Sequence, residues 1–330
     1  MDPVALTRAL VDIDSTTGQE GEVGEWLEQY LRERGFSVVT QPVRDSRFNI
    51  LATVDTPSVI FSTHIDCVPP FFVSRVEGDR LFGRGACDAK GILAAQIAAL
   101  DTLRREGETR VGLLAVVGEE RGSDGAKIAN ALANGCRFLI DGEPTDSRLG
   151  LATRGMLRLK LRATGRAAHS SFPELGESAI DKLLDALVEL RSIDLPSDPV
   201  LGRTDYTVGL IAGGVAPNVV SPSAEAEVMF RTVSGALEVH EAIRTLEPRV
   251  AIEHILEVPP ARLKTVPGFE TSIFPYTTDI PFLSGWGEPL LFGPGSILTA
   301  HTADEFISIA ELKAAVGHYM ALARHLLADG

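Results

Sequence analysis

The sequence predicts an α/β fold in which a mixed, mostly parallel sheet is flanked by helices and a smaller α+β domain is inserted. The run Val111–Val117 is apolar and mostly branched, which is typical of a strand buried on both faces of a parallel sheet, and Val59–Thr63 is another largely apolar strand. Helical patterns alternate with such strands before residue 153 and return near the end of the chain. Between these segments the expected order changes to β-α-β-β-α-β, the arrangement of a compact independent domain.

Composition excludes several classes of function. The chain has 330 residues, enough for one large or two smaller domains, and 45% of them are hydrophobic. Its net charge of −14 argues against a nucleic-acid or anionic-membrane partner. Three cysteines without a metal or disulfide spacing suit a reducing compartment. With no signal-peptide pattern and no apolar run of membrane-spanning length, we expect a cytoplasmic protein.

The first segment follows the α/β pattern element by element. Asp2-Pro3 is a helix start, because an acidic N-cap and a proline in the first turn both favour helix initiation. Gly35 ends a second amphipathic helix. The elements expected next are strands Phe36–Val43, Phe48–Val54 and Val59–Thr63, helix Gly91–Arg105, the strand from Val111, a helix from about Asp124 to Ala133, and strand Arg137–Ile140.

The rest of the chain contains the inserted domain and then the last elements of the first domain. The inserted elements expected are strand Met156–Ala163, helix Glu177–Leu190, strands Tyr206–Ala212 and Ala224–Thr232, helix Leu237–Leu246 and strand Val250–Val258. The parallel pattern resumes with strands Pro289–Leu291 and Ser296–Thr299 and a helix over Ile309–Leu327. We therefore expect residues 1–152 and 264–330 to form one domain and residues 153–263 another.

Histidines and carboxylates follow the ends of the outer strands, where ligands bind in open α/β sheets. These residues are His64, Asp66, Asp88, Glu119, Glu120, Glu143 and His301. Imidazole and carboxylate are ligands for zinc, with cobalt or manganese as substitutes, and the set exceeds what one tetrahedral ion needs. It suits two ions that share a bridging carboxylate. Taken singly, Asp88 could cap a helix, Glu143 could be a turn acid, and the Glu119-Glu120 pair could be a solvated turn.

Five motifs in a fixed order carry a family resemblance: HIDCVP, GRGACDAKG, GEE, DGEPT and AHTADE. Together they resemble the zinc-dependent aminoacylase and carboxypeptidase metallopeptidase superfamily, which includes acetylornithine deacetylase and succinyl-diaminopimelate desuccinylase. The resemblance implies a phosphorylase/hydrolase-like catalytic domain and an inserted ferredoxin-like lid or dimerisation domain. It therefore also implies a homodimer.

The resemblance assigns roles to the strand-end residues. It implies two Zn²⁺ ions, or Co²⁺ or Mn²⁺, held by His64, Asp88, Glu120, Glu143 and His301, with Asp88 bridging them. Glu119 would be the general base that deprotonates the attacking water and passes the proton to the leaving amine. Asp66 would accept the free ring N–H of His64 and fix its tautomer. A cis peptide bond is expected after Asp88.

The resemblance also suggests substrate-binding residues. His169, in the segment GRAAHSS, would stabilise the oxyanion in the partner subunit's site. Asn218 would lie near the substrate. Arg231 could bind a substrate carboxylate, although an arginine at a strand end is often only solvated. Gly293 and Gly295 would let the backbone approach the substrate closely.

These features predict a two-metal amidohydrolase that cleaves an N-acyl amino acid to an amino acid and a carboxylate, similar to acetylornithine deacetylase. A dipeptidase or carboxypeptidase using the same site is the alternative, so the substrate is a small N-acyl amino acid or a dipeptide. A non-catalytic ligand-binding protein is disfavoured by Glu119, an acid without a ligand role. A two-metal phosphoesterase is disfavoured because the chain lacks a P-loop. The chain also lacks the longer tryptophan-containing loop of larger members, and in this it resembles the small branch of the superfamily.

Overall fold

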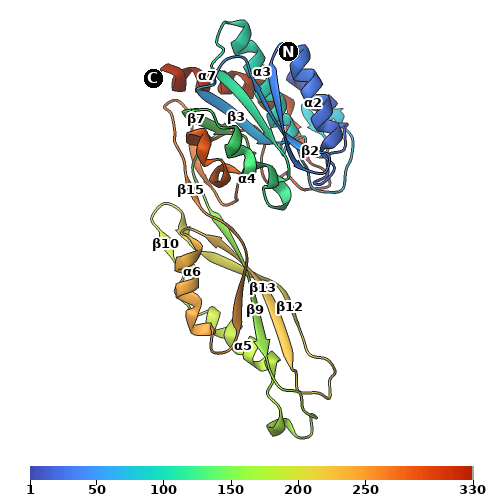
Figure 1. Ribbon diagram of the computed structural model, residues 1–330, viewed down its shortest axis with the longest axis vertical. Coiled ribbons are helices and arrows are strands. Elements are labelled where there is room, and N and C mark those ends of the chain that lie inside the picture. The colour runs from blue at the N-terminus through green and yellow to red at the C-terminus, as the bar shows by residue number, and fades with distance from the viewer. Residues whose placement is uncertain (329–330) are drawn as a thin grey trace. The chain divides into compact units, whose positions relative to one another are not determined.

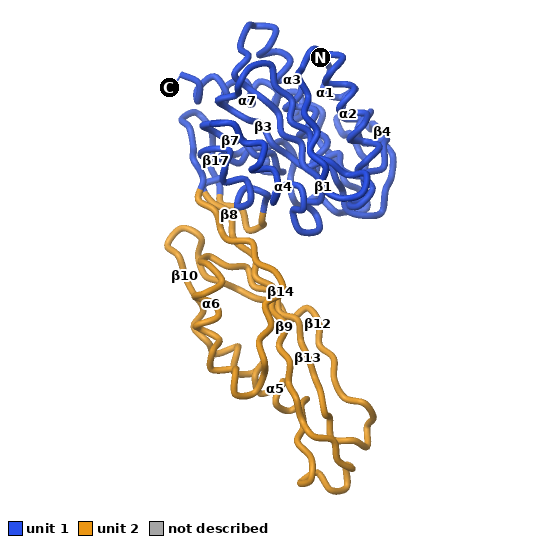
Figure 2. The backbone as a smooth tube through the Cα atoms, in the orientation of Figure 1, with its two compact units in different colours: residues 1–151, 263–272, 278–330 blue, residues 152–262, 273–277 orange. Residues whose placement is uncertain are grey.

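The computed structural model describes residues 1–328, and the chain divides into two compact units (Figure 2). Unit 1 comprises Met1–Leu151, Leu263–Ser272 and Thr278–Gly330, and unit 2 comprises Ala152–Arg262 and Ile273–Thr277. The expected boundaries placed residues 273–277 in the first domain, and this placement is wrong. The reason is hydrogen bonding: the Phe274 carbonyl accepts the Arg154 backbone N–H at 3.0 Å, so this segment belongs with the second unit.

The main sheet of unit 1 is mixed, as predicted (Figure 1). Its strand order is β1 (Ser37–Arg44), β2 (Arg47–Thr53), β6 (Val111–Val116), β3 (Val59–His64), β7 (Phe138–Asp141) and β17 (Glu288–Leu291). Strands β6, β3, β7 and β17 are parallel, whereas β1 and β2 pair antiparallel. Every residue of β3 and β6 is buried, which explains the apolar sequence of β6 and the apolar first half of β3.

Helices of unit 1 pack around this sheet. They are α1 (Pro3–Val11), α2 (Gly21–Glu33), α3 (Lys90–Arg105), α4 (Asp124–Ala129) and α7 (Ile309–Ala328). Helix α3 contacts α1, α7, β3 and β6. The Asp2 side chain caps α1 by accepting the Val4 backbone N–H at 3.0 Å, and Pro3 occupies the first turn. None of the helices within residues 1–328 has the length and hydropathy of a transmembrane span.

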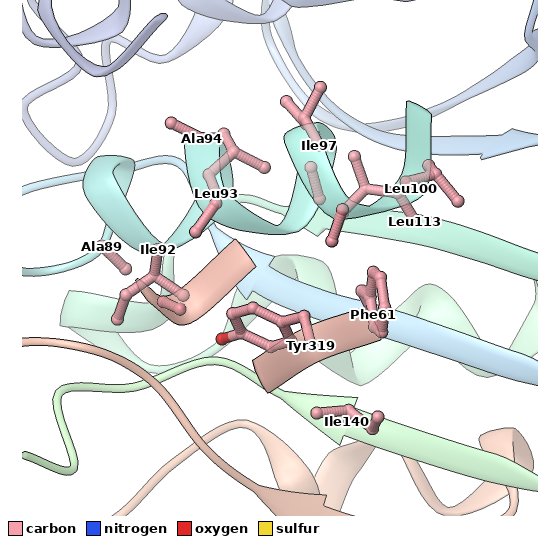
Figure 3. Close-up of a cluster of buried hydrophobic side chains, with 14 of the residues drawn as sticks. Phe61, Ala89, Ile92, Leu93, Ala94, Ile97, Leu100, Leu113, Ile140 and Tyr319 are labelled. Carbon is pink, nitrogen blue, oxygen red and sulfur yellow. The ribbon is translucent and has the colours of Figure 1, made fainter. Parts of the chain in front are cut away.

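The largest core cluster joins β3, α3 and α7 (Figure 3). Phe61 of β3 lies against Tyr319 of α7, with ring centroids 5.3 Å apart, and Ile92 and Leu93 of α3 belong to the same cluster. The Tyr319 hydroxyl donates to the carbonyl of Phe292 at 2.7 Å. The final helix is therefore fastened to the chain just after β17, at the edge where the parallel strands end.

Unit 2 has the predicted β-α-β-β-α-β order. Its elements are β9 (Gly155–Thr164), α5 (Ala179–Leu190), β12 (Asp205–Gly213), β13 (Ser223–Thr232), α6 (Ala236–Ile243) and β14 (Ala251–Val258). The four strands form an antiparallel sheet with strand order β12-β13-β9-β14. Side chains of this sheet and of the two helices form a separate apolar core. Burial alternates along β9 and β13, as expected for strands with one face on a core.

Short elements complete the chain and account for the local differences. Small sheets are formed by β18 (Phe306–Ser308), β5 (Arg80–Phe82) and β4 (Arg75–Glu77), by β15 (Ala261–Arg262), β8 (Leu149–Thr153) and β16 (Thr271–Phe274), and by β10 (Ser197–Asp198) and β11 (Gly202–Arg203). The strand predicted over Ser296–Thr299 is wrong. It is a turn with one isolated bridge to Thr145, because the Thr299 backbone N–H and hydroxyl both donate to the Ser296 carbonyl at 2.9 Å. The helix predicted to reach Ala133 ends at Ala129, followed by a 3-10 turn over Asn130–Leu132.

Candidate metal centre

Three parallel strands deliver acidic or imidazole side chains to one edge of the sheet. Strand β3 ends at His64, and β7 ends at Asp141, two residues before Glu143. After β6 the chain turns through Gly118, whose φ of +77° favours glycine, into the 3-10 turn Glu119–Arg121. Because the carboxyl ends of parallel strands share an edge, these side chains are brought together by the topology of the sheet.

Asp88 lies between two histidines from distant parts of the chain. It precedes α3, it is 5% exposed, and the Asp88–Ala89 peptide bond is cis, which confirms that expectation. The His64 Nε2 atom is 3.0 Å from Asp88 Oδ1, and the His301 Nε2 atom is 3.3 Å from Asp88 Oδ2. One carboxylate therefore presents a separate oxygen to each imidazole.

Five side chains form two groups with metal-ligand spacing. One group is His64, Asp88 and Glu143, the other is Asp88, Glu120 and His301, and within each group the candidate ligand atoms all lie within 4.8 Å of one another. Asp88 belongs to both groups. Each group offers one imidazole and two carboxylates, which is a donor set for Zn²⁺, Co²⁺ or Mn²⁺ with positions left open for other ligands.

His301 reaches this cluster from an uncommon backbone conformation. Its φ is +62°, in the left-handed region that costs a residue with a side chain about 1–2 kcal/mol. The His301 Nε2 atom lies 3.0 Å from Glu120 Oε1. Such conformations gather at functional sites, where the surrounding structure holds them in place.

The electrostatics of the cluster call for added positive charge. Burial raises the pKa of Glu143 well above its usual value and also raises that of Glu120. Burial would raise the pKa of Asp88 too, but hydrogen bonds from His301 and His64 outweigh it and lower the pKa. Hydrogen bonds to Asp88 and Glu120 raise the pKa of His301 to about 10. Bound divalent cations would favour ionised carboxylates in the same way, so the donor set fits a metal pair.

Asp66 connects His64 to the Glu119-Glu120 turn. The His64 Nδ1–H donates to the backbone carbonyl of Asp66 at 3.0 Å, while the nearer carboxylate oxygen lies 3.4 Å away. We expected the carboxylate to accept this proton, and the backbone carbonyl is instead the closer acceptor. The Asp66 carboxylate accepts the backbone N–H groups of Glu119 and Glu120 at 3.1 and 3.2 Å and the Thr17 hydroxyl at 2.9 Å. Asp66 thus fixes a candidate ligand and the adjacent acidic turn together.

The two adjacent glutamates differ in their surroundings. Glu120 contacts His301, whereas the half-buried Glu119 carboxylate has no hydrogen-bond or ion-pair partner among residues 1–328. Burial raises the pKa of Glu119 well above its usual value. An unpaired carboxylate with a raised pKa beside a cluster of metal-ligand type is a candidate general base.

Sequence reasoning gave no role to several polar residues of this region. Burial raises the pKa of Asp141 to about 8 and that of Asp279 to about 6. Asp141 stands at a strand end before Gly142-Glu143, a signal that could have identified it, whereas Asp279 follows no regular element. Thr17 and Glu305 were also missed, because their contacts with Asp66 and the Asp88 loop join segments far apart along the chain.

The candidate residues of unit 2 form a group of their own. The segments of His169 and Asn218 are paired, because His169 bridges Val219 and the Ser170 N–H donates to the Asn218 carbonyl at 3.0 Å. The exposed His169 ring accepts the Ser171 N–H at Nδ1 (3.1 Å), so its neutral form carries the proton on Nε2.

Arg231 stands apart from that pair, on the antiparallel strand β13. It lies opposite Met156 of β9 in the strand register. It is half-buried, and its guanidinium has no hydrogen-bond or ion-pair partner within residues 1–328. Its five donors are therefore available to an anion.

Gly293 and Gly295 are buried, and the structure gives them contacts with protein atoms. A Cβ atom on Gly293 would lie 2.4 Å from the Glu143 carbonyl oxygen, and one on Gly295 would lie 2.6 Å from Cys87 Sγ. Both glycines therefore let the backbone approach segments that carry candidate ligands. The substrate contact expected of them stays a prediction.

Known proteins that are similar in sequence match most of this chain. The sequence model described as "Peptidase family M20/M25/M40" matches residues 60–325. A Peptidase M20 domain-containing protein of Schizosaccharomyces pombe is 38% identical over 94% of this chain and 81% of its own length. A probable carboxypeptidase of Aspergillus terreus is 39% identical over 97% of this chain and 85% of its own length.

Solved structures share the fold at lower identity. The aminopeptidase PepT of Bacillus cereus is 19% identical with a TM-score of 0.83, covering 99% of this chain and 98% of its own. A Bacillus subtilis protein described as a dinuclear metal binding peptidase from the M20 family is 16% identical with a TM-score of 0.76, covering 98% of this chain and 97% of its own. At these identities the likeness concerns the fold alone.

Proposed function

Because this chain belongs to peptidase family M20/M25/M40 and is thus a hydrolase of peptide or amide bonds, we propose that it removes the acyl group of an N-acyl amino acid. The activity would resemble that of acetylornithine deacetylase. The observation that carries the proposal is the pair of ligand groups sharing Asp88, with the Glu119 carboxylate on the adjoining turn, unpaired among the residues that the structure describes. A metal pair and a free carboxylate are the parts that hydrolysis of an unactivated amide requires.

Two groups of side chains would each bind one cation. His64, Asp88 and Glu143 would hold one cation, and Asp88, Glu120 and His301 the other. When bound, such a pair supplies Lewis acidity and lowers the pKa of water. Zn²⁺ suits the donor set, with Co²⁺ or Mn²⁺ as substitutes.

Glu119 and His169 would handle protons and charge. Glu119 accepts a proton from the attacking water as the new C–O bond forms, and it returns that proton to the amine nitrogen as the C–N bond breaks. The Nε2–H of His169 donates to the carbonyl oxygen as it becomes negative, a role supported by the acceptor contact at Nδ1. The products are a carboxylate and a free amine, so one water is consumed.

Arg231 and Asn218 would select the substrate. The Arg231 guanidinium, which has no hydrogen-bond or ion-pair partner in the described part of the chain, suits a bidentate contact with a carboxylate. The Asn218 side chain would add neutral hydrogen bonds near the substrate. These contacts favour substrates whose amine half is an amino acid with a free carboxylate.

A carboxypeptidase or dipeptidase is the second candidate. It is favoured by the probable carboxypeptidase of Aspergillus terreus, which is 39% identical to this chain. Its substrate would present the same terminal carboxylate to Arg231, and only the acyl half would differ. A non-catalytic binding protein is disfavoured, because the Glu119 carboxylate has no structural partner among the described residues.

We expect the protein to hydrolyse one class of substrate in a panel of amides, and we expect metal removal to abolish that hydrolysis. The panel should pair N-acetylornithine and other N-acyl amino acids with dipeptides and C-terminally amidated forms of each. We predict that the protein hydrolyses N-acyl amino acids, that chelation and dialysis abolish this activity, and that Zn²⁺ or Co²⁺ restores it. Substrates whose terminal carboxylate is amidated should have a higher KM. Full activity of the chelated protein would contradict the proposal, whereas turnover of dipeptides alone would favour the second candidate.

We further propose that the chain forms a homodimer through unit 2. Strand β12 lies at the edge of its sheet, and its apolar residues Leu210 and Ile211 are 63% and 58% exposed. Leu184 and Val188 of helix α5 are also exposed. An unpaired strand edge next to apolar side chains favours pairing with an identical strand.

If His169 acts on the partner subunit, two inactive variants should complement each other. His169→Ala and Glu119→Gln proteins, mixed and allowed to exchange subunits, should recover up to about a quarter of wild-type activity, because half of the dimers are hybrids with one intact site. Glu119→Gln mixed with the Glu119→Gln/His169→Ala double variant is the matched control and should recover none. No recovery in the first mixture, after exchange is verified, would contradict action across the dimer.

A further inference from the structure

The Asp88 loop is held by a buried ion pair that the proposed chemistry does not use. The Arg84 Nη1 atom donates to Glu305 Oε2 at 2.7 Å, and the two side chains are 2% and 1% exposed. The second oxygen, Oε1, accepts the backbone N–H groups of Cys87 and Asp88 at 3.0 and 3.1 Å. Both carboxylate oxygens of Glu305 are therefore committed within this loop.

Strand pairing explains why Glu305 reaches this loop. Phe306 of β18 lies opposite Phe82 of β5 in an antiparallel ladder. Glu305 directly precedes Phe306, and Gly83 and Arg84 directly follow Phe82. The Gly83 N–H donates to the Glu305 carbonyl at 3.1 Å, which continues the contact between the two strands. Contact between the two segments thus follows from local β pairing.

The ion pair joins three segments that carry candidate ligands. Glu305 lies four residues after His301, and Arg84 lies four residues before Asp88. The Arg84 Nε atom donates to the carbonyl of Pro70 at 3.1 Å, on the segment that follows His64. Displacement of any one segment would therefore disturb the other two.

Stability alone is a weak explanation for this pair. Removing two charges from water is costly, and a well-packed apolar pair of similar volume is often as stable as a buried ion pair. An apolar pair could not accept the N–H groups of Cys87 and Asp88 or orient the Asp88 backbone. We propose that Glu305, held by Arg84, is a positioning residue that sets where the Asp88 carboxylate stands between the two cation sites. This inference rests on the proposed two-metal function.

The test compares Zn²⁺ binding in variants without any substrate. The Arg84→Met/Glu305→Leu double variant removes both charges and leaves neither unpaired, so it separates positioning from the cost of a lone buried charge. Glu305→Gln keeps one accepting oxygen. Asp101→Asn is the matched control, because Asp101 is equally buried in unit 1 and pairs with Arg104 and Arg105 at 3.0 and 2.8 Å, away from Asp88.

Competition with a chromophoric chelator should show about 10–100-fold weaker Zn²⁺ binding in the double variant and about tenfold weaker binding in Glu305→Gln. Asp101→Asn should bind Zn²⁺ as the wild type does, whatever its melting temperature. Titrating Zn²⁺ into the variants during turnover should shift the midpoint upward and preserve the plateau, a change that a purely structural role would not produce.

Wild-type affinity for both cations in the folded double variant would overturn the inference alone. If that variant does not fold, the measurement on Glu305→Gln decides, and unchanged affinity there overturns it equally. A wild-type chain that binds neither Zn²⁺ nor Co²⁺ would instead overturn the proposed function and this inference with it.

Discussion

Glu119→Gln is expected to lower turnover by about 10²–10⁴-fold while both cations stay bound. The amide is nearly the same size as the carboxylate but cannot accept the proton of the attacking water. The Glu119 side chain makes no hydrogen bond or ion pair with residues 1–328, so its neutralisation breaks no contact. Its backbone N–H, which donates to Asp66 at 3.1 Å, is unaffected. The loss should therefore fall on kcat, with KM little changed.

The measurement needs metal content and kinetics on the same preparation. Metal per chain is determined after dialysis, and initial rates follow with a substrate that the panel identifies. Glu120→Gln is the informative companion, because Glu120 contacts His301 and belongs to a ligand group. That variant should lose metal as well as activity. A fully active Glu119→Gln protein would show that Glu119 is not the base.

Asp88→Ala is expected to lose both cations and all metal-dependent activity. Asp88 is the one residue common to the two ligand groups, so its removal leaves each with two side chains. His301→Ala should instead retain the group of His64, Asp88 and Glu143 and bind about one cation per chain. The contrast between the two variants tests the bridging role directly.

Metal counting and thermal unfolding together make this comparison decisive. Without metal, Asp88→Ala removes the partner of both imidazoles as well as a negative charge beside Glu143 and Glu120, so its folding is measured first by thermal unfolding of the metal-free protein. Added Zn²⁺ should raise the melting temperature of the wild type, raise that of His301→Ala less, and leave Asp88→Ala unchanged. Two cations bound to folded Asp88→Ala protein would refute the shared-ligand arrangement.

The strands and their terminal residues could be predicted because burial leaves a direct mark on sequence. Strands β3 and β6 are buried on both faces, so β6 is apolar throughout and β3 begins with three apolar residues, and the acidic and imidazole residues at their ends are conspicuous. The same reasoning failed at Ser296–Thr299. That apolar-looking stretch follows Gly295, whose φ is +86°, and its backbone bonds within a turn.

Contacts between distant segments could not be predicted in this way. The hydrogen bond between Glu305 and Asp88 joins residues 217 positions apart, and neither periodicity nor composition reports such a pair. The choice of the Asp66 backbone carbonyl over its carboxylate as the acceptor of His64 depends on a few tenths of an ångström. The assignment of residues 273–277 to unit 2 likewise depends on long-range β pairing near Phe274.

The insertion of unit 2 imposes an order on biosynthesis. His64, Asp88 and Glu143 all precede the insertion, whereas His301 follows it. A growing polypeptide therefore exposes the complete first ligand trio more than a hundred residues before the second trio can close. Tyr319 must also be synthesised before its hydroxyl can donate to the carbonyl of Phe292, just after β17. The contact of Glu305 with the Asp88 backbone, like the second trio, can therefore form only after unit 2 has been synthesised.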